Sequence, residues 1–449
     1  MNFLHRKPPT FFIKTLGCKV NQYESQAMRE DLTRNGFLEK TDREPCDFYI
    51  INSCTVTQKA DKETRNLIRH FHRINPEGKI AIVGCYAELD KDRSFLENIP
   101  GVTHLVRNDK KREIAKLLVL NSKFQITNHE QIPNYKLKIT NFKNRNRAFI
   151  KVQDGCNHRC SYCKVSLVRG HSRSRSTEEI RSEAEHLVTA GFKEIVLTGI
   201  CLGAWGRDGK MVMLTELIKE ISAIPRRFRI RLSSIEPLYV TEDIVTLMKN
   251  EEKLCKHLHM PLQSGDDRIL KLMNRPYTVK GFRQIIKRIR EAIPDAAITT
   301  DVLLGFPGED DRSFRKTLKF IEDIRPSRMH VFPYSKREGT LAAKLEDGLG
   351  EKELAGRVKI VTEFGRKLSL EFAKRFIGKN ENVIIEDTRH KTTGLLTGYT
   401  DRYIRVSGEG PDKIKNELVP VKITNVDRDG NTAFARFNAC PDIDNAIII

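Results

Sequence analysis

The stretch DGCNHRCSYC, residues 154–163, gives the first indication of the chemistry of this chain. Cys156, Cys160 and Cys163 fall within it at a C-x3-C-x2-C spacing, and thiolates this close repel one another unless a metal or a disulfide joins them. A structural zinc site is closed by four ligands, whereas three thiolates fit a [4Fe–4S] cube with one iron left open. A zinc knuckle is the plainer alternative. The spacing favours an iron–sulfur site whose open iron can bind a small molecule.

Composition narrows the classes of protein to consider. The chain has 449 residues, with 79 Lys and Arg against 59 Asp and Glu, and a formal net charge of +20. This charge is expected of a nucleic-acid binder, although a merely basic soluble protein also has it. The first residues lack the apolar run of a signal peptide, and no stretch approaches the roughly 18 apolar residues of a membrane span. We expect a soluble cytoplasmic protein without a membrane partner. In that reducing compartment, its ten cysteines are expected to bind metal or take part in catalysis rather than to form disulfides.

Residues 10–120 alternate between short apolar strands and helices. Strands are expected at Phe11–Ile13, Phe48–Ile51, Ile80–Val83 and Leu105–Val106, and helices at Gln22–Asn35, Lys59–Ile74 and Lys110–Leu120. Such alternation predicts a doubly wound α/β domain, in which helices cover both faces of a parallel sheet.

Three further cysteines, Cys18, Cys54 and Cys85, each lie just past the carboxyl end of one of these strands. Ligands bind at that edge of an open α/β sheet, so the three thiols are expected to converge there. Unrelated structural cysteines are the alternative. Three thiols at equivalent places suggest a second iron–sulfur cluster with an open iron.

A longer alternation begins at Ala148. Strands are expected at Phe149–Val152, Glu194–Thr198, Arg229–Leu232, His257–Leu262, Ile298–Leu304 and Met329–Phe332, and helices at Thr177–Thr189, Thr215–Ile221, Thr241–Lys249, Thr278–Glu291 and Asp311–Ile324. Six such units predict a partial (β/α)6 barrel, whose active site lies at the carboxyl ends of the strands. The loop with Cys156, Cys160 and Cys163 follows the first of these strands, as that rule requires.

Polar residues and glycines mark the other strand ends of this barrel. The candidates for cofactor contacts are Thr198, Gly199, Ser233, Glu236, Gln263 and Asp301. Glycine lets a cofactor lie against the backbone, and the polar side chains can hydrogen-bond ribose hydroxyls and an ammonium group. A polar residue in a loop is often only solvated, so the prediction of a cofactor site depends on finding such residues at the ends of all these strands.

The C-terminal part changes to a different pattern. After the long basic helix expected at Glu353–Arg375, short strands are expected at Val383–Ile385, Gly394–Thr397, Tyr403–Val406, Val419–Ile423 and Ala433–Phe437. This spacing predicts a small antiparallel OB-like barrel, a common oligonucleotide-binding shape. Possible RNA contacts, each of which is more often an ordinary solvated residue, are Arg389, His390, Lys391, Arg402 and Tyr403.

The domain boundaries follow from these changes of pattern. We expect an N-terminal domain at 9–122, a linker at 123–141, the partial barrel at 142–372 and the small barrel at 373–440. In and just after the linker, basic residues could touch phosphate or simply be solvated: Lys136, Lys138, Lys143, Arg145 and Arg147.

The cysteine loop, with the aromatic Tyr162 just before its last cysteine, resembles that of the radical S-adenosylmethionine (SAM) enzymes. The domain order over about residues 10–440 is similar to the methylthiotransferases, which combine an N-terminal three-cysteine domain, a radical-SAM barrel and a C-terminal TRAM domain. Two stretches, TLGCKVNQYE at 15–24 and NSCTVT at 52–57, resemble the bacterial branch that acts on N6-threonylcarbamoyladenosine.

The resemblance implies a function and a set of cofactors. Cys156, Cys160 and Cys163 would hold the cluster that binds SAM, with Tyr162 among the cofactor contacts, and no catalytic residue is implied beyond the cluster ligands. The three N-terminal cysteines would hold a second [4Fe–4S] cluster that carries the sulfur. The implied reaction converts N6-threonylcarbamoyladenosine at position 37, in the anticodon loop of tRNA, to its 2-methylthio derivative. It needs an external electron donor and a sulfur source, and it implies no particular oligomeric state.

Other functions stay open. Members of this family also modify isopentenyladenosine in tRNA or an aspartate of a ribosomal protein, and a non-catalytic, metal-stabilised RNA-binding protein is a further alternative. The chain departs from common family patterns at Ser166, Cys201 and Trp205. Cys201 is a possible but unneeded ligand, whereas we interpret Cys46, Cys255 and Cys440 as structural or incidental.

Overall fold

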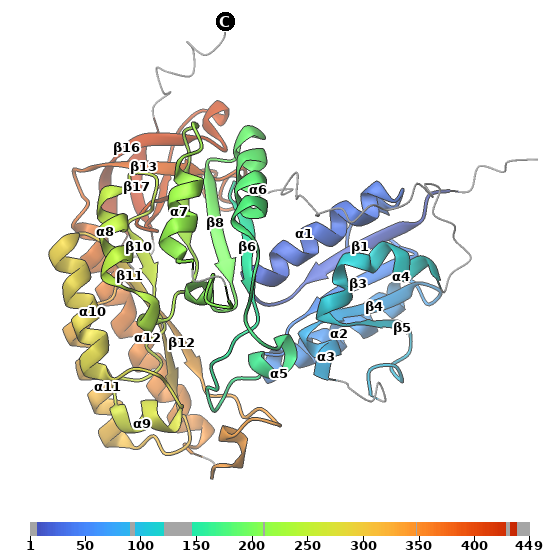
Figure 1. The fold of residues 1–449 in the computed structure, drawn as a ribbon, viewed down its shortest axis with the longest axis horizontal. Helices are drawn as coiled ribbons and strands as arrows, with labels where there is room; N and C mark the ends of the chain where they lie inside the picture. Colours follow the sequence, from blue (N-terminus) through green and yellow to red (C-terminus); the bar gives the residue numbers. More distant parts are fainter. Residues whose placement is uncertain are drawn as a thin grey trace, which may run out of the picture. The chain divides into compact units, whose positions relative to one another are not determined.

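A computed structural model describes residues 7–89, 95–120, 146–209, 212–346, 348–427 and 432–437 (Figure 1). The chain forms two compact units: Met1–Asn141 with Gly155–His158 and Cys163–His171, and Phe142–Asp154 with Arg159–Tyr162 and Ser172–Ile449. The expected linker, with Lys136, Lys138, Lys143 and Arg145, lies outside the described residues, as does Cys440. The four domain boundaries therefore stay predictions. No described helix is both long and apolar enough to cross a membrane.

The first unit is a parallel sheet with strand order β2-β1-β3-β4-β5. Its strands are β1 (Thr10–Thr15), β2 (Leu38–Glu39), β3 (Phe48–Ser53), β4 (Lys79–Gly84) and β5 (Val102–Val106). Its helices are α1 (Lys19–Arg34), α2 (Gln58–Ile74), α3 (Cys85–Leu89) and α4 (Ile114–Leu120), with a 3-10 turn at Asn108–Glu113.

Alternation along β3 shows why helices cover both faces of this sheet. Phe48 and Ile50 join a core with residues of α1 and α4, whereas Tyr49 and Ile51 join a separate core with residues of α2. Successive side chains of a strand point to opposite faces, so a strand that is apolar throughout needs a helical layer on each side. The predicted doubly wound domain is confirmed.

The second unit contains the partial barrel. Its parallel strands are β6 (Ala148–Asp154), β8 (Glu194–Gly199), β9 (Arg229–Leu232), β10 (His257–His259), β11 (Ala297–Leu304) and β12 (Arg328–Pro333). The bridge between Ser234 and His259 links the strands β6-β8-β9 to β10-β11-β12. The helices are α6 (Thr177–Thr189), α7 (Leu214–Ser222), α8 (Glu242–Asn250), α9 (Asp267–Leu272), α10 (Val279–Ala292), α11 (Asp311–Ile324) and α12 (Glu351–Lys374). The predicted (β/α)6 barrel is confirmed.

Some short elements differ from the expectation. The fourth barrel strand ends at His259 rather than Leu262, because Pro261 has no N–H to donate and Gln263 has a positive φ of 65°. Two short elements after the cysteine loop, α5 (Val165–Arg169) and β7 (Arg173–Ser174), were not expected. They are too short for hydrophobic periodicity to reveal them.

The C-terminal strands close into a five-stranded barrel. They are β13 (Asn380–Ile385), β14 (Leu396–Thr400), β15 (Arg405–Gly408), β16 (Leu418–Val426) and β17 (Ala433–Arg436), in the order β13-β14-β15-β17-β16. Figure 1 shows this barrel beside the amino ends of β6 and β8. Arg229 and Arg231 take part in the contact, because their guanidiniums donate to backbone oxygens of Tyr399 and Thr400.

Candidate functional site

The sheet of the first unit places three cysteines at one edge. Cys18 caps the start of α1, Cys54 directly follows β3, and Cys85 begins α3 after β4. Because β1, β3 and β4 are neighbours in the sheet, these positions lie side by side at its carboxyl edge. Gly17 has φ +88°, and a Cβ there would lie 2.7 Å from the Cys54 Sγ. The loop before Cys18 therefore needs glycine for the cysteines to approach.

Burial changes the acidity of two of these thiols. It raises the pKa of Cys18, and it raises the pKa of Cys54 to about 11. A thiol with such a pKa keeps its proton at neutral pH, whereas a metal ligand must be the thiolate. Three thiols side by side at a sheet edge suit the cluster expected from the sequence.

A buried group of charges lies beside these cysteines. Glu24 accepts hydrogen bonds from Lys111 Nζ at 2.6 Å and from Arg169 at 2.8 Å, and Arg169 also donates to Asn21 Oδ1 at 2.6 Å. Arg169 opposes the effect of burial on the pKa of Cys18. Two cations share one carboxylate, so the group of charges beside the cysteines has excess positive charge.

The second cysteine triplet lies on the loop that follows β6. Cys156 donates its N–H to the Gly170 carbonyl at 3.0 Å, and Cys163 Sγ accepts the N–H of Val165 at 3.4 Å. Gly155 has φ +73°, and a Cβ there would lie 1.9 Å from the His171 carbonyl oxygen, so only glycine fits the turn that starts the loop.

Arg275 supports the remaining cysteine of this loop. Its guanidinium donates to Cys160 Sγ at 3.1 Å, to Tyr277 Oη at 3.1 Å and to the carboxylate of Glu236. Glu236, expected to contact a cofactor, is thus engaged by Arg275. An arginine next to a cysteine favours the thiolate, which is the metal-binding form of the side chain.

The other expected cofactor residues lie on the same barrel. Thr198 and Gly199 end β8, and a Cβ at Gly199 would lie 2.9 Å from Gln153 Oε1. Ser233 follows β9, and its buried hydroxyl has no hydrogen-bond partner among the described residues. Gln263 follows β10 in a left-handed conformation.

Tyr162 packs edge-to-face on Phe306, with the ring centroids 6.3 Å apart. The structure thus gathers the expected cofactor residues at the carboxyl half of the barrel. The unpartnered Ser233 hydroxyl is consistent with a polar ligand there. Their roles stay predictions.

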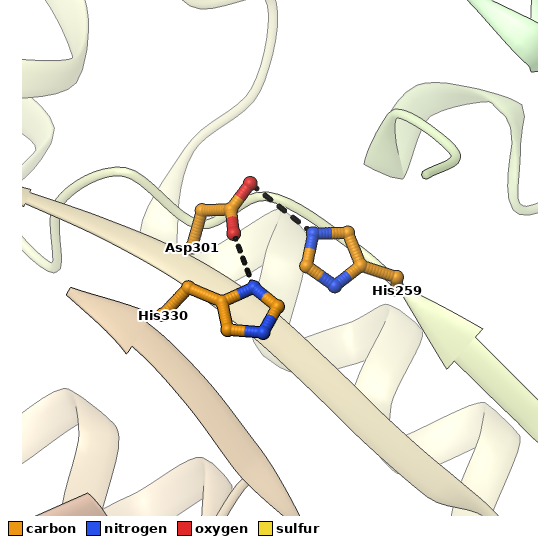
Figure 2. A group of neighbouring side chains, drawn as sticks. All are labelled: His259, Asp301 and His330. Atoms are coloured by element: carbon orange, nitrogen blue, oxygen red, sulfur yellow. Dashed lines mark hydrogen bonds and ion pairs between the residues drawn. The ribbon is translucent and has the colours of Figure 1, made fainter. Parts of the chain in front are cut away.

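Asp301 contacts two histidines that the sequence interpretation missed. His259 on β10 and His330 on β12 lie on either side of it (Figure 2). Although burial raises the pKa of Asp301, the hydrogen bonds to both histidines hold that pKa far below its usual range. Only the strand register could have revealed this group, because its members are spread over 72 residues.

Arg169 and Arg275 were missed as well. Arg169 reaches Glu24 across 145 positions of sequence, and Arg275 reaches Cys160 across 115. No local spacing signals such contacts.

Several other residues have a packing role. Cys201 and Trp205 are buried, and the Trp205 indole N–H donates to the Arg175 carbonyl at 3.0 Å. Cys46 and Cys255 are also buried. Cys46, Cys201 and Cys255 therefore lie in the core.

Two of the possible RNA contacts lie between the barrels. Arg402 pairs with Asp295 at 2.6 Å, and Tyr403 stacks on His257. Both therefore join the small barrel to the partial barrel. Among the remaining candidates, Arg389 pairs with Asp412 at 2.6 Å.

Two family models match the chain. The model described as Radical SAM superfamily matches residues 150–321, and that described as Uncharacterized protein family UPF0004 matches residues 10–107.

Curated relatives span nearly the whole chain. The threonylcarbamoyladenosine tRNA methylthiotransferase MtaB of Thermotoga maritima is 38% identical, covering 88% of this chain and 90% of the relative. The protein of the same name from Bacillus subtilis is 36% identical, with 92% and 93% covered. The tRNA-2-methylthio-N(6)-dimethylallyladenosine synthase of Acetivibrio thermocellus is 32% identical, with 94% and 89% covered.

Solved structures agree with the fold. The radical SAM methyltransferase TsrM of Kitasatospora setae has a TM-score of 0.52 at 12% identity, covering 72% of this chain and 73% of that chain. At this identity the similarity concerns the fold alone.

Proposed function

The chain belongs to the methylthiotransferase family of radical SAM enzymes, and from that membership we propose that it methylthiolates N6-threonylcarbamoyladenosine at position 37 of tRNA. The observation that carries the proposal is 36–38% identity over 88–94% of the chain to relatives named for that modification. Synthases named for the dimethylallyl nucleoside are 31–33% identical over a similar length.

Family membership implies a [4Fe–4S] cluster and SAM. We assign that cluster to Cys156, Cys160 and Cys163, and a second cluster to Cys18, Cys54 and Cys85. When bound, these groups supply the radical that removes the C2 hydrogen of adenine and the sulfur that replaces it. The chemistry belongs to the cofactors, and the protein orients them and excludes water.

The side chains near each triplet have distinct roles in this proposal. Arg275 donates to Cys160 and fixes Glu236, so this pair would hold one side of the SAM site in place. Ser233 would provide a hydroxyl for the nucleoside part of SAM. At the other triplet, Arg169 and Lys111 would offset the charge of bound thiolates.

The net charge of +20 supports an RNA substrate, because phosphate contacts attract any RNA. An anticodon-loop base can be unstacked and enter the mouth of a barrel, as single-stranded bases commonly do. An external electron donor and a sulfur source would complete the reaction.

The decisive experiment compares two purified tRNAs that differ only in the modified base. One bears threonylcarbamoyladenosine and the other isopentenyladenosine, and mass spectrometry of nucleosides measures the 2-methylthio product of each. We expect product from the threonylcarbamoyl form only. Replacing Cys18, Cys54 and Cys85 by Ala should abolish the product while 5′-deoxyadenosine still forms from SAM.

Other results would overturn the proposal. Product from the isopentenyl form alone would move the chain to the other tRNA branch, and activity only on a ribosomal protein would exclude tRNA. If SAM cleavage survives in the Cys156, Cys160 and Cys163 to Ala variant, that loop does not hold the SAM cluster. Absence of both iron and SAM cleavage would favour a non-catalytic RNA-binding protein.

A further inference from the structure

Three titratable side chains inside the partial barrel form a group that neither cysteine triplet includes (Figure 2). His259 Nε2 lies 3.1 Å from Asp301 Oδ2, and His330 Nδ1 lies 3.2 Å from Asp301 Oδ1. Within the described part of the chain, this is the one set of His, Cys, Asp and Glu residues whose ligand atoms all lie within 4.8 Å of one another. The two cysteine triplets need not meet this distance limit, because the thiolates that hold a [4Fe–4S] cluster bind separate irons.

Strand register brings the three side chains together. Asp301 and His330 are direct partners between β11 and β12, and His259 pairs with Thr299, which shares a face of β11 with Asp301. On the other face of β12, Met329 packs against α12. The group therefore faces the inner side of the barrel, away from the covering helix.

The geometry points to a binding site for a divalent transition-metal ion, which we propose is held by His259, Asp301 and His330. Imidazole nitrogens and a carboxylate oxygen suit zinc or iron(II). Bonds of about 2.0–2.2 Å place tetrahedral ligands about 3.3–3.6 Å apart, slightly farther than the two N–O separations in the group. Small side-chain rotations would bring all three atoms onto one ion.

The surroundings also suit a metal. His259 Nδ1 lies 2.8 Å from the Thr299 hydroxyl, which leaves Nε2 directed toward Asp301. Such a partner on the second nitrogen fixes ring orientation in metal sites. The His330 side chain is 46% exposed, so an ion can enter and keep open positions for water or an oxygen donor of a ligand. The alternative is a metal-free network in which Asp301 only holds two imidazoles.

Zinc uptake by the full-length protein separates these possibilities, whatever the function of the chain. The protein is first reconstituted anaerobically with iron and sulfide to occupy the cysteines, and then dialysed against Zn²⁺ and analysed for both metals. We expect one zinc per chain beyond the iron. Asp301→Asn and His330→Ala should each weaken zinc binding more than about tenfold, with iron content and thermal unfolding near those of the wild type.

A matched control is His390→Ala, because His390 in the small barrel contacts the Thr393 hydroxyl at 3.0 Å and belongs to no such group. This variant should keep its zinc. If Asp301→Asn loses iron as well, it has unfolded, and the more exposed His330→Ala decides. No zinc uptake by the wild type, or equal uptake by wild type and His330→Ala, would overturn the proposal.

Discussion

Gly17 shows how a single residue can control how closely the chain approaches a cysteine. Its φ of +88° disfavours any side chain, and a Cβ would lie 2.6 Å from the Cys54 Cβ and 2.7 Å from its Sγ. We expect Gly17→Ala to cost about 1–3 kcal/mol from backbone strain and more from this clash. It should also lower the iron bound per chain by about half. Thermal unfolding and iron analysis measure the two effects.

The control for this prediction is Gly378→Ala. Gly378 has a similar φ of +82°, but nothing lies within 4 Å of its Cβ position. This variant carries the backbone strain without the clash, so its iron content should match the wild type. Equal iron in both variants would contradict the assignment of Cys54 as a ligand.

Arg275 tests how a neighbouring cation tunes the other triplet. Its guanidinium donates to Cys160 Sγ and pairs with Glu236. Hydrogen bonds to the sulfurs and net charge set the potential of a cluster, so Arg275→Met should lower the reduction potential by on the order of tens of millivolts. A redox titration followed by electron paramagnetic resonance measures it.

Arg268→Met removes an exposed cation that pairs with Asp310, and should leave the potential unchanged. A potential unaltered by Arg275→Met would show that this contact is only structural.

At the scale of helices and strands, the sequence predicted the longer elements but not the short β2, α3, α5, β7 and α9. Helices Thr177–Thr189 and Asp311–Ile324 match their predicted bounds, because a clear apolar period and a capping side chain at Ser176 or Asp310 mark them. The convergence of Cys18, Cys54 and Cys85 was predictable too, since parallel strands place their carboxyl ends at one edge.

Contacts that depend on tertiary structure were not predictable in this way. The His259–Asp301–His330 group requires the register of three strands, which hydrophobic pattern alone does not give. The contact of Arg275 with Cys160 joins a loop to a segment 115 residues away. Arg402 and Tyr403 were predicted as possible RNA contacts because one is basic and the other aromatic, but both lie against the partial barrel. Sequence pattern predicts which face of an element is buried, but not the element that covers it.

For the molecule as a whole, the position of the small barrel bears on how it could meet RNA. It contacts Arg229 and Arg231 at the start of β9, whereas the cysteine loop follows the carboxyl end of β6. A strand of six residues is about 20 Å long. RNA held by the small barrel would therefore be anchored about that far from the mouth where the base reacts. Removing everything after Arg375 would also remove the backbone oxygens of the small barrel that accept from these guanidiniums, so substitutions within the contact are a cleaner test of it.

Glu194 is the charge on which this contact depends. It is fully buried and accepts from Arg229 at 2.5 Å and from Arg231 at 2.9 Å. Burial by itself raises the pKa of Glu194, but the two guanidiniums outweigh it and hold the pKa far below its usual range. Glu194→Gln leaves two buried cations without their shared carboxylate and should lower the free energy of unfolding by about 3–5 kcal/mol at neutral pH.

The sign of the pH dependence follows from that depressed pKa. A carboxylate whose pKa is lower in the folded state contributes stability above its unfolded pKa of about 4.3, and loses it as the pH falls further toward the folded value. The difference between wild type and Glu194→Gln should thus be constant from neutral pH down to about pH 5 and shrink below it. Urea unfolding of the cluster-free protein at several pH values measures this.

Glu363→Gln removes an exposed partner of Lys359 and should change stability little at any pH. Equal losses in the two variants at neutral pH would mean that the buried charges do not hold the small barrel in place.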